Sequence, residues 1–191
     1  MSIRDKKPRQ HNCSVPVRFW NLIRNVPDIL DMRTMLYIGG NSSRLQMIKS
    51  FKWAGIKIDL IEIWKPYVKE IKVVNKKYEY FDRIILGDVS KPLMAQVGKT
   101  YDAVVWWHGP EHVDEQALPK CLANIERITD KVAVAACPHG HCGQGVTKDG
   151  NIFQRHRYDV YPTHFTNEGW KAETLLPEPS MRSHILAWYR P

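Results

Sequence analysis

The sequence predicts an α/β fold: a doubly wound, mostly parallel seven-stranded sheet with helices on both faces and an antiparallel C-terminal strand. Two observations predict it. Between residues 33 and 136, short apolar runs typical of buried strands alternate with segments of helical periodicity. The last two strand candidates, 170–175 and 184–189, follow each other with little helix between them, which indicates antiparallel pairing at one edge.

The first half of the chain supplies three strand–helix units. Strands are expected at 35–38, 56–63 and 83–86, and helices at 44–53, 66–78 and 92–97. Ser42 and Ser43 are candidate N-caps of the first of these helices, and Pro66 suits the first turn of the second. Ahead of them, apolar residues at helical spacing in 17–30, interrupted by Pro27, predict one or two short helices outside the core.

The second half supplies the remaining strands, which are expected at 101–107, 131–136, 170–175 and 184–189. Asp114 is expected to cap a helix that runs to residue 128. The stretch 137–161 has no regular pattern, and 162–169 is consistent with a helical turn.

Length and composition are those of one globular domain, with 191 residues, 43% hydrophobic and 25% charged. We expect a basic tail and helical arm over 1–32 and the main domain over 33–191. The apolar runs are far shorter than the ~20 residues of a membrane span, so no membrane partner is expected. The basic start has no apolar stretch behind it, and the four cysteines suit a reducing compartment, so we expect a cytoplasmic protein.

The net charge of +8 is compatible with an acidic partner or substrate. Lys65, Lys69, Lys72 and Lys76 share one face of the expected helix at 66–78. We interpret this face as solvated, with an anionic partner such as RNA as the alternative.

Residues suited to ligand binding follow three neighbouring strands. The turn at Gly39 and Gly40 lets a ligand approach the backbone, and Glu62 ends the next strand 23 residues after Gly39. A carboxylate at that spacing can accept hydrogen bonds from the ribose of an adenosine-containing ligand, and Asp88, after the third strand, from an adenine amino group. The alternative is that Asp88 caps the helix after it and that Glu62 is a solvated strand end.

Four segments carry a resemblance to a known family: LYIGGN at 36–41, IDLIEIW at 58–64, GDVS at 87–90 and YDAVVWWHGPEHVDE at 101–115. Over about 33–191 the sequence resembles class I S-adenosylmethionine-dependent methyltransferases, in particular the group that acts on small molecules. The later runs CPHGHCGQG and DGNIFQRH also look like that group. The resemblance implies a Rossmann-like methyltransferase fold, S-adenosylmethionine as cofactor and a small-molecule acceptor.

The resemblance also implies which residues contact the cofactor. The methionine end is expected at the first turn, the ribose at the end of the second strand, the adenine after the third, and the methyl group beside Trp107 and His108. The cofactor-binding residues are thus expected to be Tyr37, Gly39, Gly40, Asn41, Glu62, Ile63, Asp88, Val89 and Trp107. The sequence departs from the family pattern at Tyr37, where an acidic residue is usual, and at Asn41 and Ser43, where glycine is usual.

His108 and His112 are the candidate catalytic residues. Imidazole titrates near neutrality, so either could remove a proton from the acceptor. Alternatively, His112 packs at the start of the next helix, and Glu111 is an acid in its first turn.

Cys137, His139, His141 and Cys142 form a dense run of side chains that can bind zinc. Adjacent ligands at 141 and 142 do not suit one ion, so we interpret the run as a substrate-facing loop and predict no metal. Whether His156 and His164 join a site in space is not visible in the sequence. Two functions remain as alternatives: an RNA methyltransferase, and a binding module that kept the fold without productive cofactor binding.

Overall fold

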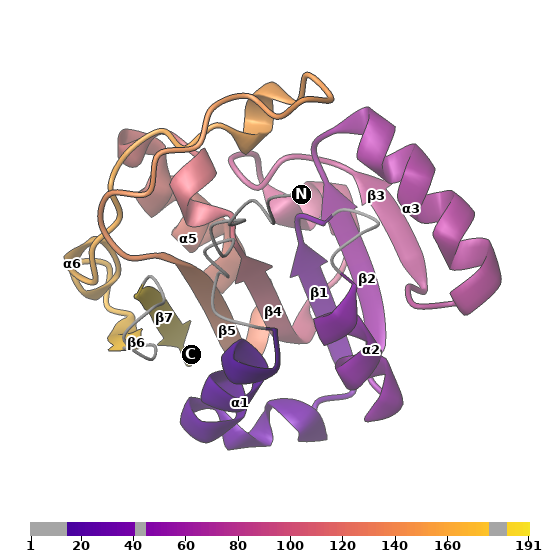
Figure 1. Cartoon of the computed structure of the whole chain (residues 1–191). Coiled ribbons are helices and arrows are strands. Elements are labelled where there is room, and N and C mark those ends of the chain that lie inside the picture. Colours follow the sequence, from indigo (N-terminus) through magenta and orange to yellow (C-terminus); the bar gives the residue numbers. More distant parts are fainter. Residues whose placement is uncertain (1–14, 41–44, 176–182) are drawn as a thin grey trace, which may run out of the picture.

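The computed structural model describes residues 15–40, 45–175 and 183–191. Within these residues one sheet of seven strands has the order β3-β2-β1-β4-β5-β7-β6 (Figure 1). The strands are β1 (Thr34–Ile38), β2 (Lys57–Glu62), β3 (Arg83–Leu86), β4 (Tyr101–Trp107), β5 (Thr129–Pro138), β6 (Lys171–Leu175) and β7 (His184–Tyr189). β1 to β5 pair in parallel, whereas β7 is antiparallel to both β5 and β6. The predicted fold class is confirmed.

Helices cover both faces of the sheet (Figure 1). They are α1 (Val15–Asn25), α2 (Gln46–Trp53), α3 (Lys65–Tyr78), α4 (Leu93–Val97), α5 (Leu118–Glu126) and α6 (Thr163–Thr166). Short 3₁₀ turns connect some of them: η1 (Pro27–Asp31), η2 (Pro110–His112), η3 (Glu115–Ala117) and η4 (Ile152–Gln154). The first three helices pack in one core cluster and the last three in a second. None of the helices that the structure describes has the length and apolar character needed to cross a bilayer.

Successive strand residues alternate between the two core clusters. On β1, Tyr37 packs on the side of α1 to α3, whereas Ile38 packs on the side of α4 to α6. On β4, Trp107 and Trp106 divide in the same way. The alternation follows from the two-residue period of a strand, and it decides which side chains reach the site described below.

The N-terminal arm is part of this core. α1 stops at Asn25, and Pro27 begins η1 instead, as expected for a residue that cannot continue a helix. Leu22 and Val26 are fully buried. Trp20, one of the apolar residues at helical spacing in 17–30, is 70% exposed, so not all of these residues face the core as the spacing predicted.

Two expected elements differ from the structure. The helix expected over 114–128 is divided into η3 and α5, with Pro119 in the first turn of α5. The Asp114 side chain forms no cap; its carboxylate lies 3.6 Å from Arg157 instead. β5 is longer than expected because β7 pairs along it as far as Pro138 and His184. The cap positions Ser42 and Ser43 lie outside the described residues.

Candidate functional site

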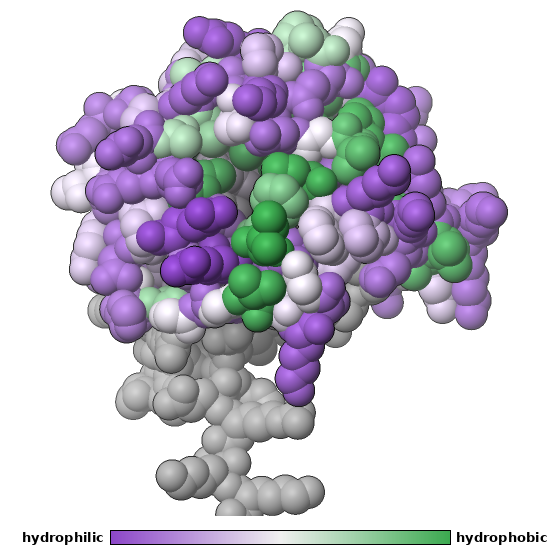
Figure 2. All heavy atoms as spheres, turned by 90° about the horizontal axis from the view of Figure 1, so that it is seen from above, coloured by the Kyte–Doolittle hydropathy of each residue, from purple (hydrophilic) through white to green (hydrophobic). Residues whose placement is uncertain are grey.

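A pocket lies where the carboxyl ends of β1 to β4 meet. The space between its walls is about 580 Å³, including the part open to solvent. Figure 2 views the molecule from the side toward which β1 points and shows hydrophobic residues gathered near the centre of this face, among hydrophilic ones. The predicted residues that line the pocket are Gly39, Glu62, Ile63, Asp88, Val89 and His112.

Glu62 connects the first turn to the end of β2. Its Oε2 accepts a hydrogen bond of 2.8 Å from the backbone N–H of Gly40, and its Oε1 one of 2.7 Å from that of Trp64. The side chain is only 5% exposed. Burial raises the pKa of the Glu62 carboxyl, against the lowering effect of these backbone N–H groups. Glu62 is therefore not a solvated strand end.

Asp88 lies in a tight turn after β3. Its Oδ1 accepts a 2.8 Å hydrogen bond from the backbone N–H of Ser90, whereas the residue that precedes α4 is Pro92. Asp88 therefore does not cap α4, and that alternative is wrong. Gln96 holds the turn from α4, because its amide accepts from the Asp88 N–H and donates to the Asp88 carbonyl, both at 2.8 Å.

The sequence did not single out Gln96, nor Asn124, whose amide donates a 2.9 Å hydrogen bond to the carbonyl of Val89. Both residues act on backbone groups of the turn after β3. No sequence pattern marks such a side-chain amide, because its hydrogen-bond partners depend on how its helix packs against the turn.

Four predicted residues are not among those that line the pocket: Tyr37, Gly40, Trp107 and His108. Tyr37 and Trp107 belong to the core cluster on the side of α1 to α3, and Trp106 contributes to the pocket wall instead. Gly109 makes this possible, since a Cβ at that position would collide with the Trp106 indole. Asn41 lies outside the described residues.

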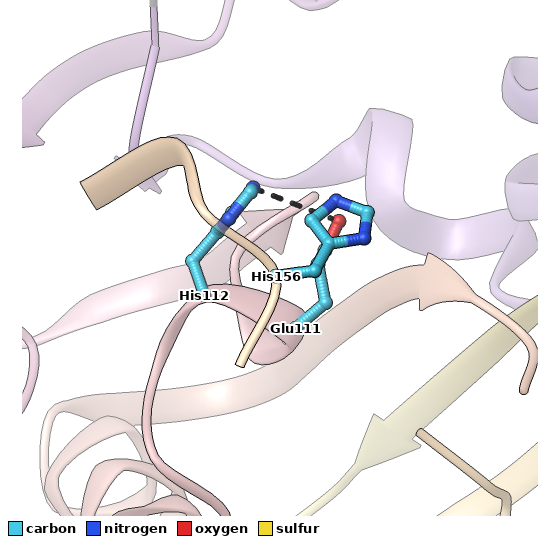
Figure 3. Close-up of side chains that lie close together, drawn as sticks. All are labelled: Glu111, His112 and His156. Atoms are coloured by element: carbon cyan, nitrogen blue, oxygen red, sulfur yellow. Dashed lines mark ion pairs between the residues drawn. The ribbon is translucent and has the colours of Figure 1, made fainter. Parts of the chain in front are cut away.

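A second polar group surrounds Glu111 at the start of η2 (Figure 3). Glu111 is 2% exposed; its Oε1 lies 3.0 Å from His108 Nδ1 and 3.8 Å from His112 Nε2. His112 Nδ1 lies 3.2 Å from the carbonyl of Arg155, and its ring centroid is 5.0 Å from that of His156. Burial lowers the pKa of His112, against the raising effect of the Glu111 carboxylate. The structure thus brings His108 and His112 together around one carboxylate.

The segment between β5 and α6 crosses the end of the sheet and closes the site. Gly140 bridges Val160, and the Arg157 N–H donates a 2.9 Å hydrogen bond to the carbonyl of Glu111. At its far end, Phe153 contacts Trp64 with ring centroids 5.9 Å apart and lines the pocket together with Gln154. The sequence predicted an irregular stretch here, and its contacts make it a cover for the pocket.

The cysteine and histidine run does not converge on one point. Cys137 is buried in the core, and burial raises the pKa of its thiol well above the usual value. His139 Nδ1 lies 3.2 Å from Ser183 Oγ, and the His141 side chain is 84% exposed beside Asp159. In the part of the chain that the structure describes, the side chains grouped closely enough to hold a metal ion are those of Glu111, His112 and His156.

Comparison with known proteins shows the fold. No family model matches the chain, and no curated protein matches its sequence. Among solved structures, it resembles a SAM dependent methyltransferase from Archaeoglobus fulgidus (TM-score 0.61, 18% identity, 92% of this chain and 95% of that one). It also resembles the N-methyltransferase NodS from Bradyrhizobium japonicum WM9 (TM-score 0.60, 12% identity, 91% of this chain and 93% of that one). A third similar structure is the magnesium protoporphyrin IX methyltransferase from Synechocystis PCC 6803 with bound SAH (TM-score 0.62, 16% identity, 92% of this chain and 81% of that one). The chain therefore has the fold of class I methyltransferases.

Proposed function

We propose that this protein transfers a methyl group from S-adenosylmethionine to a small-molecule acceptor. The observation that carries the proposal is the pocket at the ends of β1 to β4, in which Glu62 and Asp88 lie together among apolar residues. Ligands of doubly wound sheets bind at this edge. Two carboxylates suit the ribose hydroxyls and the amino group of an adenosine, and the apolar walls suit its flat adenine ring. The fold of the methyltransferase structures supports the same assignment.

The residues present fit the cofactor part by part. Gly39, with a φ of 77°, lines the pocket where the methionine end is expected, and the N–H of the next residue, Gly40, is held by Glu62. Glu62 is assigned to the ribose hydroxyls, with Ile63 beside it. The turn of Asp88 and Val89, held by Gln96, is assigned to the adenine. Trp106 and Phe153 supply apolar surface on the other sides.

Bound S-adenosylmethionine supplies a methyl group on a sulfonium sulfur, and the protein aligns it with the acceptor and excludes water. The cover formed by Phe153 and Gln154 suits the exclusion of water. His108 is the candidate general base, because its Nδ1 faces the buried Glu111 carboxylate at 3.0 Å and its Nε2 is then the proton-accepting nitrogen. A carboxylate in that place orients the ring and stabilises the imidazolium. His112 lies farther from the Glu111 carboxylate, at 3.8 Å, and its Nδ1 is directed to the Arg155 carbonyl, so we assign it to positioning.

A small acceptor agrees with the covered pocket better than RNA does. Lys65, Lys69, Lys72 and Lys76 lie exposed on α3, as a solvated helix face would. An RNA substrate bound through these lysines would show affinity that falls steeply with salt. Acceptor turnover that is insensitive to salt is the result we expect.

The first experiment measures binding of S-adenosylmethionine and S-adenosylhomocysteine to the purified chain by calorimetry. We expect micromolar affinity in the parent and at least about tenfold weaker binding in Glu62→Ala, since the ribose loses a charged hydrogen-bond partner. Glu173→Ala, an exposed carboxylate on β6, is the matched control and should bind like the parent. Binding by neither ligand at millimolar concentration would reject the enzyme and favour the binding module.

A further inference from the structure

Three potential metal ligands converge beside the pocket (Figure 3). Glu111 and His112 come from η2, directly after β4, and His156 comes from the covering segment 44 residues further along the chain. One ligand atom from each lies within 4.8 Å of the others. A backbone hydrogen bond of 2.9 Å from the Arg157 N–H to Glu111 fixes the covering segment at this place, and one of 3.0 Å from the His156 N–H to Gln144 lies within the segment itself.

The hydrogen bonds of the two imidazoles fix which nitrogen carries the proton. His112 Nδ1 lies 3.2 Å from the carbonyl of Arg155, and His156 Nδ1 contacts the carbonyl of Cys142. A carbonyl oxygen only accepts, so each Nδ1 donates, and the Nε2 of a neutral ring is then a lone-pair acceptor. His112 Nε2 lies 3.8 Å from Glu111 Oε1. One nitrogen of each imidazole and one oxygen of the buried carboxylate thus lie within 4.8 Å of one another, which a cation can bridge.

We propose that Glu111, His112 and His156 bind a divalent transition-metal ion, with zinc as the best representative of its class. Two imidazoles and one carboxylate form a ligand set typical of zinc and non-haem iron sites that keep open positions, and they suit magnesium or calcium poorly. Imidazole rings held by backbone carbonyls through the second nitrogen are the usual support of such ligands. His108, 3.0 Å from the Glu111 carboxylate, orients that ligand from the other side.

The spacing requires only small side-chain movements. Bonds of ~2.1 Å in tetrahedral geometry place ligand atoms about 3.4 Å apart. The pair of Glu111 Oε1 and His112 Nε2 is already at 3.8 Å, and the widest separation in the group is within 4.8 Å. Small side-chain rotations that move the ligand atoms by about one ångström bring them to this spacing.

The ion would lie next to the pocket, because His112 belongs to both. This consequence rests on the proposed function: an open position on the ion would hold an oxygen of the acceptor near the methyl group, and a Lewis acid makes such a hydroxyl easier to deprotonate. The site therefore favours an oxygen nucleophile.

The test is a calorimetric titration of the metal-stripped full chain with ZnCl₂, and separately with MgCl₂. No S-adenosylmethionine or other cofactor is present in either titration. CoCl₂ provides a second readout, since its visible spectrum reports ligand type and geometry. We expect one zinc ion per chain, much weaker magnesium binding, and zinc affinity at least about tenfold lower in both Glu111→Gln and His156→Ala. His141→Ala, an exposed imidazole of the cysteine and histidine run, should bind like the parent.

No zinc binding by the folded parent would overturn the proposal. So would parent-like affinity in Glu111→Gln and His156→Ala, or a loss in His141→Ala, because the ion would then be held elsewhere. Circular dichroism verifies that each variant is folded, and His156→Ala, on the covering segment, provides the test if Glu111→Gln does not fold. Since no cofactor is present, a negative result leaves the proposed methyltransferase activity intact, and failure of cofactor binding leaves the metal site intact.

Discussion

Glu62 and Gly40 lie 22 positions apart, yet the Glu62 carboxylate accepts a 2.8 Å hydrogen bond from the Gly40 N–H. The other carboxylate oxygen accepts from the Trp64 N–H. The side chain assigned to the ribose therefore also holds the shape of the glycine turn assigned to the methionine end. A change at Glu62 affects both ends of the cofactor pocket.

Glu62→Gln should lower both stability and cofactor affinity. The new amide presents an NH₂ group to one of the two backbone N–H donors, which is left without an acceptor in a buried place. We expect the free energy of unfolding to fall by about 1–3 kcal/mol. Urea unfolding measures the loss, with Glu173→Gln as the control. Stability equal to that of the parent would show that these hydrogen bonds do not hold the turn.

Asp59 should make stability depend on acid pH. The residue is 2% exposed, and its Oδ2 accepts from Tyr101 Oη at 2.7 Å and from Arg83 and Lys99, each at 2.9 Å. Burial raises the pKa of the Asp59 carboxyl, but these three partners outweigh it and hold the pKa below the usual value.

Because the folded-state pKa of Asp59 is depressed, the group stabilises the fold above its unfolded pKa of ~3.9 and less as pH falls through the folded value. Asp59→Asn should therefore cost about 2–4 kcal/mol at pH 7, and the difference from the parent should shrink near pH 3. Urea unfolding at the two pH values measures it. A difference that is equal at both would contradict the assignment.

Gly109→Ala should disrupt the pocket wall. The added methyl would occupy the place of the Trp106 indole, so the ring or the turn after β4 must move. Such overpacking typically costs about 1–3 kcal/mol. We expect a lower melting temperature and weaker S-adenosylmethionine binding. Gly145→Ala, where a methyl meets open space, is the control, and an equal effect in both variants would exclude the collision as the cause.

Gln96→Ala should weaken cofactor binding more than it weakens the fold. Its amide holds both backbone groups of Asp88 from a position on α4. Without it, the turn assigned to the adenine loses its orientation, and we expect several-fold weaker binding of S-adenosylhomocysteine by calorimetry. Gln116→Ala, an exposed glutamine in η3, should change nothing.

The sequence was sufficient for the sheet because buried parallel strands are mostly apolar, as in the run that became β4. The resemblance pointed to Trp107, whereas Trp106 lines the pocket, because the two-residue period says that the two indoles face opposite sides but not which side holds the pocket. The break between η3 and α5 was missed because Asp114 looked like a cap, and its partner Arg157 comes from a distant segment.

The candidate site was predictable where its residues follow strands and not where they meet in space. Glu62 and Asp88 lie in the pocket because strand ends share one edge. His156 joins Glu111 only through the path of an irregular segment, for which spacing along the chain has no predictive value. Gln96 and Asn124 form hydrogen bonds with backbone groups, and every residue has these groups, so the sequence does not show which ones are bound.

The position of β7 between β5 and β6 has a consequence for synthesis on the ribosome. Within the described residues, β6 pairs only with β7, although β6 is made earlier. A nascent chain folds from its N-terminus, so β1 to β5 can assemble while β6 has no neighbour to join and the outer edge of β5 stays open. The sheet is completed only when residues 184–189 have emerged, and a ribosome that stalls before them would leave two unpaired strand edges exposed to aggregation.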